Sequence, residues 1–318
     1  MHYDIFNGDA DGIFALHQYR LDKPLPETRL ITGVKRDIRL LAQIEDVHNS
    51  HLSVFDISLD SNRAELLQLL QQNNTLIYFD HHFAGDIPQS PHLQACIDPS
   101  PKTCTSLLVN ASLAGRHYRW AISGAFGDNL HDLANRHAQE QGLTTQQTGQ
   151  LQELGELFNY NGYGTSLDDL HYHPRDLYLA IAPFSDPFDF FDHSPELAAL
   201  RTGYTEDLAL IMQIKEMATV GKNRMYTLPD APWARRVTGV FSNLRARELP
   251  HAAHAVITEN KDTSLRISVR APLDDPRDAD TLCKLFPTGG GRKAAAGINS
   301  LPAEQLDAFM ESFLSFYR

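Results

Sequence analysis

The sequence predicts an α/β fold in which a parallel sheet is covered by helices and followed by a second, smaller α/β domain. Residues 1–130 alternate short apolar runs with helical patterns, as in sheets whose parallel strands are joined by helices. At 226–233, the segment YTLPDAPW combines two prolines with a turn-forming aspartate, and a new strand pattern follows it. We therefore expect a large domain at 1–225, a linker at 226–233 and a small domain at 234–318.

The individual elements follow from the spacing of apolar residues. In the large domain, strands are expected at 3–6, 29–32, 52–57 and 75–79. The segment SNRAELLQLLQQNN, residues 61–74, has leucines at helical spacing, and Ser61 is placed to cap it. Residues 104–225 are expected to be mostly helical. In the small domain, strands are expected within 251–260 and 265–272, and helices near 279–285 and at 301–318.

Composition indicates an ordinary globular protein of the cytoplasm. A chain of 318 residues, 42% of them hydrophobic, can bury a sizeable core. The apolar stretches are shorter than the roughly 18–20 residues that cross a bilayer, and the start, MHYDIFNGDADG, does not resemble a signal peptide. The three cysteines form no CxxC pair, which argues against a cysteine zinc site.

The charge distribution bears on possible partners. The formal net charge of −12 should repel long duplex nucleic acid from most of the surface. Residues 231–318 carry 12 Lys and Arg against 10 Asp and Glu, so the acidic excess lies in residues 1–230. This pattern suits cations bound to the large domain and an anionic ligand on the small one, although ordinary surface variation would explain it equally well.

Acidic residues and histidines follow three of the predicted strands. Asp9 and Asp11 follow the first, Asp56 the third, and the triplet Asp80-His81-His82 ends the fourth. Taken alone, DxDG is also typical of a turn or helix cap. Three strand ends together favour a metal site, because ligands bind beyond the carboxyl ends of parallel strands. We expect adjacent histidine side chains to diverge, with His81 on metal, His82 towards substrate and Asp80 orienting a neighbouring histidine ring.

These motifs resemble those of the DHH phosphoesterases. This superfamily includes RecJ-type exonucleases, nanoRNases, cyclic-dinucleotide phosphodiesterases, exopolyphosphatases and family II inorganic pyrophosphatases. The segment GGGRKAAAG, residues 289–297, matches the GGGHxxAAG signature of the DHH-associated domain except at one position. The other matching residues are Asp9 and Asp11 of the DxD motif, Asp56, the naming triplet Asp80, His81 and His82, and Asp128 in WAISGAFGDNL.

The resemblance implies a pair of Mn²⁺ ions bridged by Asp56, with Mg²⁺ or Co²⁺ as alternatives. Asp9 would bind one ion, and Asp11, His81 and Asp128 the other. Mixed oxygen and imidazole ligands suit Mn²⁺ independently of the family. His82 and Asp80 would act catalytically in the hydrolysis of a phosphate ester by metal-activated water. The substrate phosphate would be held by Gly289, Gly290, Gly291, Arg292 and Lys293.

Two departures from the family pattern affect these expectations. Many members have histidine two residues before the first aspartate, where this chain has Asn7. An amide oxygen is a weaker ligand, so the ion on the Asp9 side is expected to be loosely held or absent. Arg292 replaces the histidine of GGGH, yet with Lys293 it still offers positive charge to a phosphate.

The leading functional hypothesis is a phosphodiesterase acting on short single-stranded oligonucleotides or small nucleotides. At 318 residues the chain has space for the two core domains but not for the added modules of full RecJ-type exonucleases, which favours short substrates. One alternative is an exopolyphosphatase or pyrophosphatase, although family II pyrophosphatases do not share the GGG-type second domain. Another is a nucleotide-binding sensor with weak turnover. No metal-type aspartate is missing, which argues for an enzyme. The oligomeric state is left open.

Overall fold

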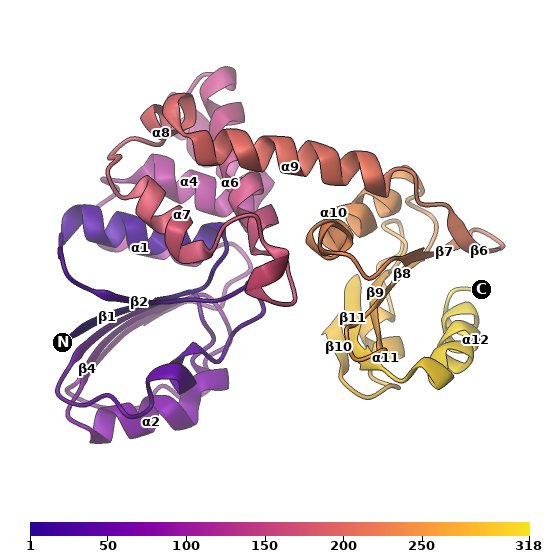
Figure 1. Cartoon of the computed structure of the whole chain (residues 1–318), viewed down its shortest axis with the longest axis horizontal. Helices are drawn as coiled ribbons and strands as arrows, with labels where there is room; N and C mark the ends of the chain where they lie inside the picture. The colour runs from indigo at the N-terminus through magenta and orange to yellow at the C-terminus, as the bar shows by residue number, and fades with distance from the viewer. The chain divides into compact units, whose positions relative to one another are not determined.

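The chain divides into two units, each built on its own sheet. A computed structural model describes residues 1–219 and 221–318 in full and residue 220 by its backbone. The units are Met1–Tyr204 and Thr205–Arg318, and helix α9 (Pro195–Ile211) contributes to both (Figure 1).

The first unit contains a five-stranded sheet in the order β2-β1-β3-β4-β5, with every neighbouring pair parallel. Its strands are β1 (His2–Phe6), β2 (Arg29–Ile31), β3 (His51–Phe55), β4 (Thr75–Asp80) and β5 (Leu93–Ile97). The predicted parallel sheet is confirmed, and four of its strands lie where the apolar runs indicated. The edge strand β5 was not predicted, because its residues LQACI are only partly buried and form no clear apolar run.

Helices cover both faces of this sheet. In Figure 1, α1 lies on one side of the sheet and α2 on the other. Helices can pack against both faces because neighbouring side chains along a strand point to opposite faces of the sheet. Leu52 and Val54 of β3 pack into the core on the α2 side, whereas Phe55 packs into the core on the α1 side.

The remaining helices of the first unit form the layer on the α1 side. This agrees with the mostly helical pattern expected after residue 104. Pro174 and Pro187 stand at the first positions of two of these helices, where the missing N–H costs no hydrogen bond. The helices of the unit are α1 (Ala10–Asp22), α2 (Arg63–Gln71), α3 (Thr105–Ser112), α4 (Tyr118–Gly127), α5 (His131–Glu140), α6 (Thr145–Gly162), α7 (Pro174–Ile181) and α8 (Pro187–His193).

The second unit contains a six-stranded mixed sheet in the order β10-β11-β9-β8-β7-β6. Its strands are β6 (Glu216–Val220), β7 (Asn223–Leu228), β8 (His254–Glu259), β9 (Leu265–Arg270), β10 (Gly289–Arg292) and β11 (Ala295–Leu301). Its helices are α10 (Pro232–Glu248), α11 (Ala279–Cys283) and α12 (Leu306–Phe316). Phe309 and Phe313 of α12 are buried in the core of this unit, as its amphipathic pattern predicted. The α/β character predicted for the smaller domain is confirmed.

The boundary between the units differs from the expected one. The chain divides at Tyr204, and residues 226–233 contain the end of β7 and the beginning of α10 rather than a free linker. The strand β7 belongs to the second unit because it pairs with β8 in parallel. The hairpin of β6 and β7 also interrupts the segment expected to be helical up to residue 225, and Gly221 turns it with a φ of 60°.

One expectation about a helix start was wrong, and one helix was not expected. Helix α2 begins at Arg63 after Asn62, so Ser61 does not cap it; the Asn62 side chain instead bonds the backbone of Leu41 and Ile38. Helix α10 was not predicted.

No helix in the described part of the chain combines the length and the apolar character that crossing a bilayer requires.

Candidate metal centre

The candidate site lies where three parallel strands end side by side. Phe6 of β1 is in register with Phe55 of β3, and Phe55 with Phe79 of β4. The segments directly after these strands carry the predicted ligands. They therefore meet at the carboxyl edge of the sheet, where ligands of open parallel sheets bind.

His81 brings three of the predicted aspartates around one point. Its Nε2 atom lies 3.5 Å from Asp56 Oδ1, 3.7 Å from Asp128 Oδ2 and 4.0 Å from Asp11 Oδ2. These separations exceed normal hydrogen bonds, and they place three carboxylates beside one imidazole nitrogen. Carboxylate oxygens with an imidazole nitrogen form a donor set that fits a divalent metal.

Asp11 is fixed by the start of α3. The backbone N–H groups of Thr105 and Ser106 donate to its two carboxylate oxygens, each at 2.7 Å, and the Ser106 hydroxyl donates to the Asp11 carbonyl at 2.8 Å. The first N–H groups of a helix lack partners within the helix, so a carboxylate there is stabilised. Cys104 precedes the helix as its N-cap residue, and burial raises the pKa of its thiol well above the usual range. This segment therefore serves as the start of a helix, and its buried thiol is a poor candidate for a nucleophile.

Asp56 occupies the middle of the cluster in an uncommon backbone conformation. Its φ is 59°, in the left-handed region that aspartate and asparagine tolerate better than most residues. The Thr105 hydroxyl donates to its Oδ1 at 2.9 Å. Burial, followed by the charges of Asp11 and Asp9, raises the pKa of Asp56 well above its usual range. The surroundings of the cluster thus do not neutralise all of its negative charge, and a bound cation would neutralise the rest.

Asp128 completes the cluster from the end of α4. It is the C-cap residue of that helix, and its side chain is 22% exposed. Burial and the charge of Asp11 raise its pKa to about 6, against the opposing effect of Lys35.

Asp80 and His82 form a pair beside the cluster. Asp80 Oδ1 lies 2.7 Å from His82 Nδ1, which is the orienting contact that the sequence suggested. Burial lowers the pKa of His82, but the hydrogen bond and charge of Asp80 outweigh it and raise this pKa. Asp80 Oδ2 is buried without a hydrogen-bond partner among the described residues.

The two histidines lie closer together than expected. Their ring centroids are 4.6 Å apart, whereas adjacent residues of a continuing strand would point their side chains in opposite directions. The reason is that β4 ends at Asp80, so the alternation of a strand no longer governs His81 and His82. Among the described residues, Asp56, His81 and His82 have ligand atoms within 4.8 Å of one another. His82 is thus within reach of the same cation as His81.

Lys35, which sequence reasoning missed, lies among the predicted ligands. Its Nζ atom is 2.6 Å from Asp9 Oδ2, 2.8 Å from Asn159 Oδ1 and 3.9 Å from Asp128 Oδ1. Burial opposes its charge, but Asp9 raises the pKa of Lys35 well above the usual range; Lys35 in turn lowers the pKa of Asp9 against the effect of burial. The signal in the sequence was a lysine shortly after the β2 strand, whose carboxyl end lies at the same edge of the sheet.

Asn7 contacts Lys35 rather than the cluster around His81. Its Nδ2 group donates to the Lys35 carbonyl at 3.2 Å, and its Oδ1 atom is buried without a hydrogen-bond partner among the described residues. The Asp9 side of the site therefore combines an amide and an ion-paired carboxylate. This is a poorer fit to a metal than the set around His81.

The glycine-rich segment forms a strand of the second unit. Gly289, Gly290, Gly291 and Arg292 make up β10, which pairs with β11, and Arg292 and Lys293 are exposed. Gly289 is required by packing, since a Cβ there would lie 1.8 Å from the Cys283 carbonyl oxygen. Gly291 has a φ of 139°, which other residues rarely adopt. At least two of the glycines are thus required by the local structure.

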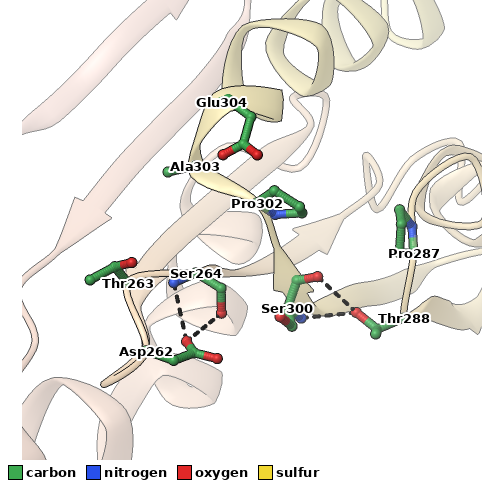
Figure 2. Close-up of a pocket in the computed structure, with 9 residues that line it drawn as sticks. All are labelled: Asp262, Thr263, Ser264, Pro287, Thr288, Ser300, Pro302, Ala303 and Glu304. Atoms are coloured by element: carbon green, nitrogen blue, oxygen red, sulfur yellow. Dashed lines mark hydrogen bonds between the residues drawn. The ribbon is translucent and has the colours of Figure 1, made fainter.

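A cavity of about 440 Å³ lies elsewhere in the second unit (Figure 2). Its polar lining includes Asp262, Ser264, Thr288 and Ser300, with Ser300 N–H donating to Thr288 Oγ1 at 2.9 Å. None of the predicted site residues lines it.

No protein-family model and no curated protein sequence matches the chain. Solved structures do match it. Exonuclease RecJ bound to manganese is similar with a TM-score of 0.59 at 16% identity, over 99% of this chain and 89% of that chain. The pGpG-specific phosphodiesterase PggH from Vibrio cholerae is similar with a TM-score of 0.58 at 12% identity, over 100% and 99% of the two chains.

A third similar structure is an exopolyphosphatase-related protein from Bacteroides fragilis. Its TM-score is 0.50 at 14% identity, over 99% of this chain and 92% of that chain. The likeness predicted from the motifs is thus confirmed at the level of the fold. At sequence identities of 12–16%, this similarity establishes a shared fold.

Proposed function

We propose that the chain is a metal-dependent phosphoesterase that hydrolyses phosphodiester bonds in short single-stranded oligonucleotides or small nucleotides. The observation that carries the proposal is the meeting of Asp11, Asp56 and Asp128 around His81 at the carboxyl edge of a parallel sheet. Such side chains can hold a divalent cation for hydrolysis of a phosphate ester. We expect Mn²⁺ first, with Mg²⁺ and Co²⁺ as alternatives.

The similar structures support this class of substrate. RecJ is an exonuclease whose structure contains manganese, and PggH is a phosphodiesterase specific for pGpG. Both substrates contain phosphodiester bonds between nucleotides. The formal charge of this chain, −12, agrees better with a short substrate than with a long duplex.

The chain's own residues have separate roles in the proposed reaction. When bound, a divalent cation would neutralise charge on the phosphate oxygens and ease ionisation of the attacking water. Asp11, Asp56, Asp128 and His81 would hold that cation. His82, oriented through its Nδ1 atom by Asp80, would act at the phosphoryl group.

The test combines binding with turnover. The purified protein, stripped of metal by a chelator, is expected to gain thermal stability on addition of Mn²⁺, because a ligand that binds the folded state stabilises it. With Mn²⁺ it should release product from a panel of dinucleotides, short oligomers, 3′-phosphoadenosine 5′-phosphate and polyphosphate. Bound metal without turnover of any substrate would contradict the proposal.

Phosphoanhydride hydrolysis is the second candidate, favoured by the likeness to an exopolyphosphatase-related protein. The exposed Arg292 and Lys293 would suit a ligand made of phosphates alone. Competition separates the candidates. A phosphodiesterase that recognises a base should be inhibited by mononucleotides, whereas polyphosphate hydrolysis that is insensitive to them would favour the second candidate.

Replacing Arg292 with alanine is expected to raise KM about tenfold or more and to leave kcat nearly unchanged. The proposed contact with a phosphate holds the substrate and the transition state alike, and a charged hydrogen bond contributes about 1.5–3 kcal/mol. Steady-state kinetics on the active substrate measures both constants.

Two further variants test whether the effect on KM depends on this particular arginine. Arg292→Lys keeps the charge but loses bidentate geometry, so its KM should lie between those of the wild type and the alanine variant. Lys261→Ala removes an exposed positive charge elsewhere in the same unit and should leave KM unchanged. An unaltered KM of Arg292→Ala for every active substrate would exclude the proposed phosphate contact.

A further inference from the structure

We propose that the ammonium group of Lys35 takes the place of one of the two cations that the DHH resemblance implies, so that this centre holds a single divalent ion. This inference rests on the proposed phosphoesterase function. It concerns the Asp9 side of the site, where the residues fit a second ion poorly.

Lys35 is held in place by its backbone as well as by its side chain. Its N–H donates to the Gly162 carbonyl at 2.9 Å, and its carbonyl accepts from Asn7 Nδ2 at 3.2 Å. The side chain is 22% exposed, and Nζ lies 5.4 Å from the centre of the Tyr163 ring. The lysine is therefore a fixed part of the site rather than a mobile surface residue.

Asp9 already has partners for both carboxylate oxygens. Oδ1 accepts from the Gly12 backbone N–H at 3.1 Å, and Oδ2 accepts from Lys35 Nζ at 2.6 Å. A cation at Asp9 would have to displace the ammonium group and overcome its repulsion at close range. The residue two positions earlier offers no imidazole to compensate, because it is Asn7, whose amide N–H₂ faces the Lys35 carbonyl.

The ammonium group can also bind a phosphate oxygen, which is one function of the second cation that the resemblance implies. It has three N–H donors, of which Asp9 and Asn159 take two. Among the described residues, no further acceptor lies within hydrogen-bond distance of the third, so it could donate to a phosphate oxygen. Nζ also lies 3.9 Å from Asp128 Oδ1, so its positive charge borders the cluster around His81. Lys35 would thus bind the substrate phosphate beside the single metal.

The experiment measures metal content and turnover in the full chain. Titration of the metal-free protein with Mn²⁺ by calorimetry, checked by elemental analysis after desalting, should give one tight ion per chain. Electron paramagnetic resonance should show isolated Mn²⁺ without the spin coupling of a close pair. Two tightly bound, coupled ions in the wild type would overturn the inference.

Two substitutions at position 35 test the role of the charge. Lys35→Met should lower kcat/KM roughly tenfold or more, because a charged hydrogen bond to the phosphate is lost. Lys35→Arg should retain more activity with one ion per chain. Lys23→Met, at an exposed lysine outside the cluster, serves as the control and should match the wild type. Lys35→Met turnover equal to that of the wild type would contradict the phosphate role.

Restoring the implied ligands provides the converse test. The double variant Asn7→His with Lys35→Ala should bind a second Mn²⁺ ion and show spin coupling, while the wild type binds one. If the double variant folded but still bound one ion, Lys35 would not be what excludes the second. These readouts remain valid if no phosphoesterase substrate is found, and turnover with two bound ions would refute this inference alone.

Discussion

Replacing Asp56 with asparagine is expected to lower kcat by about a thousandfold or more while leaving the fold intact. Asp56 stands at the middle of the cluster, 3.5 Å from His81 Nε2, and an amide there removes a charge that would hold the cation. A loss of about 4 kcal/mol of transition-state stabilisation corresponds to that factor. Steady-state kinetics, circular dichroism and Mn²⁺ titration measure the three expected results.

Asparagine is the appropriate replacement because of the backbone at this position. The φ of 59° is tolerated by asparagine but strained for alanine, and the amide oxygen can still accept from the Thr105 hydroxyl. Asp278→Asn is a matched control, since Asp278 also has a positive φ, 63°, but lies in the second unit. Substantial activity in Asp56→Asn would show that this carboxylate is not at the centre of the chemistry.

Replacing Asp80 with asparagine is expected to lower kcat by about 10- to 100-fold with Mn²⁺ still bound. Asp80 is a positioning residue: its Oδ1 fixes the His82 ring at 2.7 Å, and partners that orient such rings typically contribute effects of this size. The measurement is kcat together with metal content. Asp86→Asn, in an exposed position shortly after the triplet, should behave as the wild type.

A double-mutant cycle shows whether Asp80 acts through His82. If it does, Asp80→Asn should add little to the effect of His82→Gln, because the ring that it orients is already absent. Additive losses would instead assign Asp80 a separate role. Loss of bound Mn²⁺ in His82→Gln would identify His82 as a metal ligand, as its proximity to Asp56 and His81 allows.

The inner strands and the aspartates and histidine that follow them, Asp11, Asp56 and His81, could be predicted because their signals are local in the sequence, whereas Asp128 was expected only from the family resemblance. The inner strands are short apolar runs, and each is followed at once by its polar site residues. Helix α10 gave no comparable signal, since it buries Arg235 and Arg236 instead of presenting an uninterrupted apolar stripe. Asp230 and Asp207 pair with these two arginines, and such pairing makes buried charges tolerable.

Lys35 could not be predicted because its partners are distant along the chain. Asp9 is 26 positions before it, and Asn159 is 124 positions after it. A lysine after a strand is ordinarily a solvated residue. The close approach of the two His81 and His82 rings likewise depends on where β4 ends, which alternation of residues does not reveal.

The attachment of Asp11 to α3 makes that residue part of the fold as well as of the site. Its carboxylate accepts two N–H groups at the start of the helix, and natural selection for folding alone would preserve it in a descendant that had lost turnover. Asp128 is different, because its side chain contacts the site residues His81 and Lys35 and is partly exposed. In related chains, retention of Asp128 would therefore distinguish working enzymes from decayed ones better than retention of Asp11.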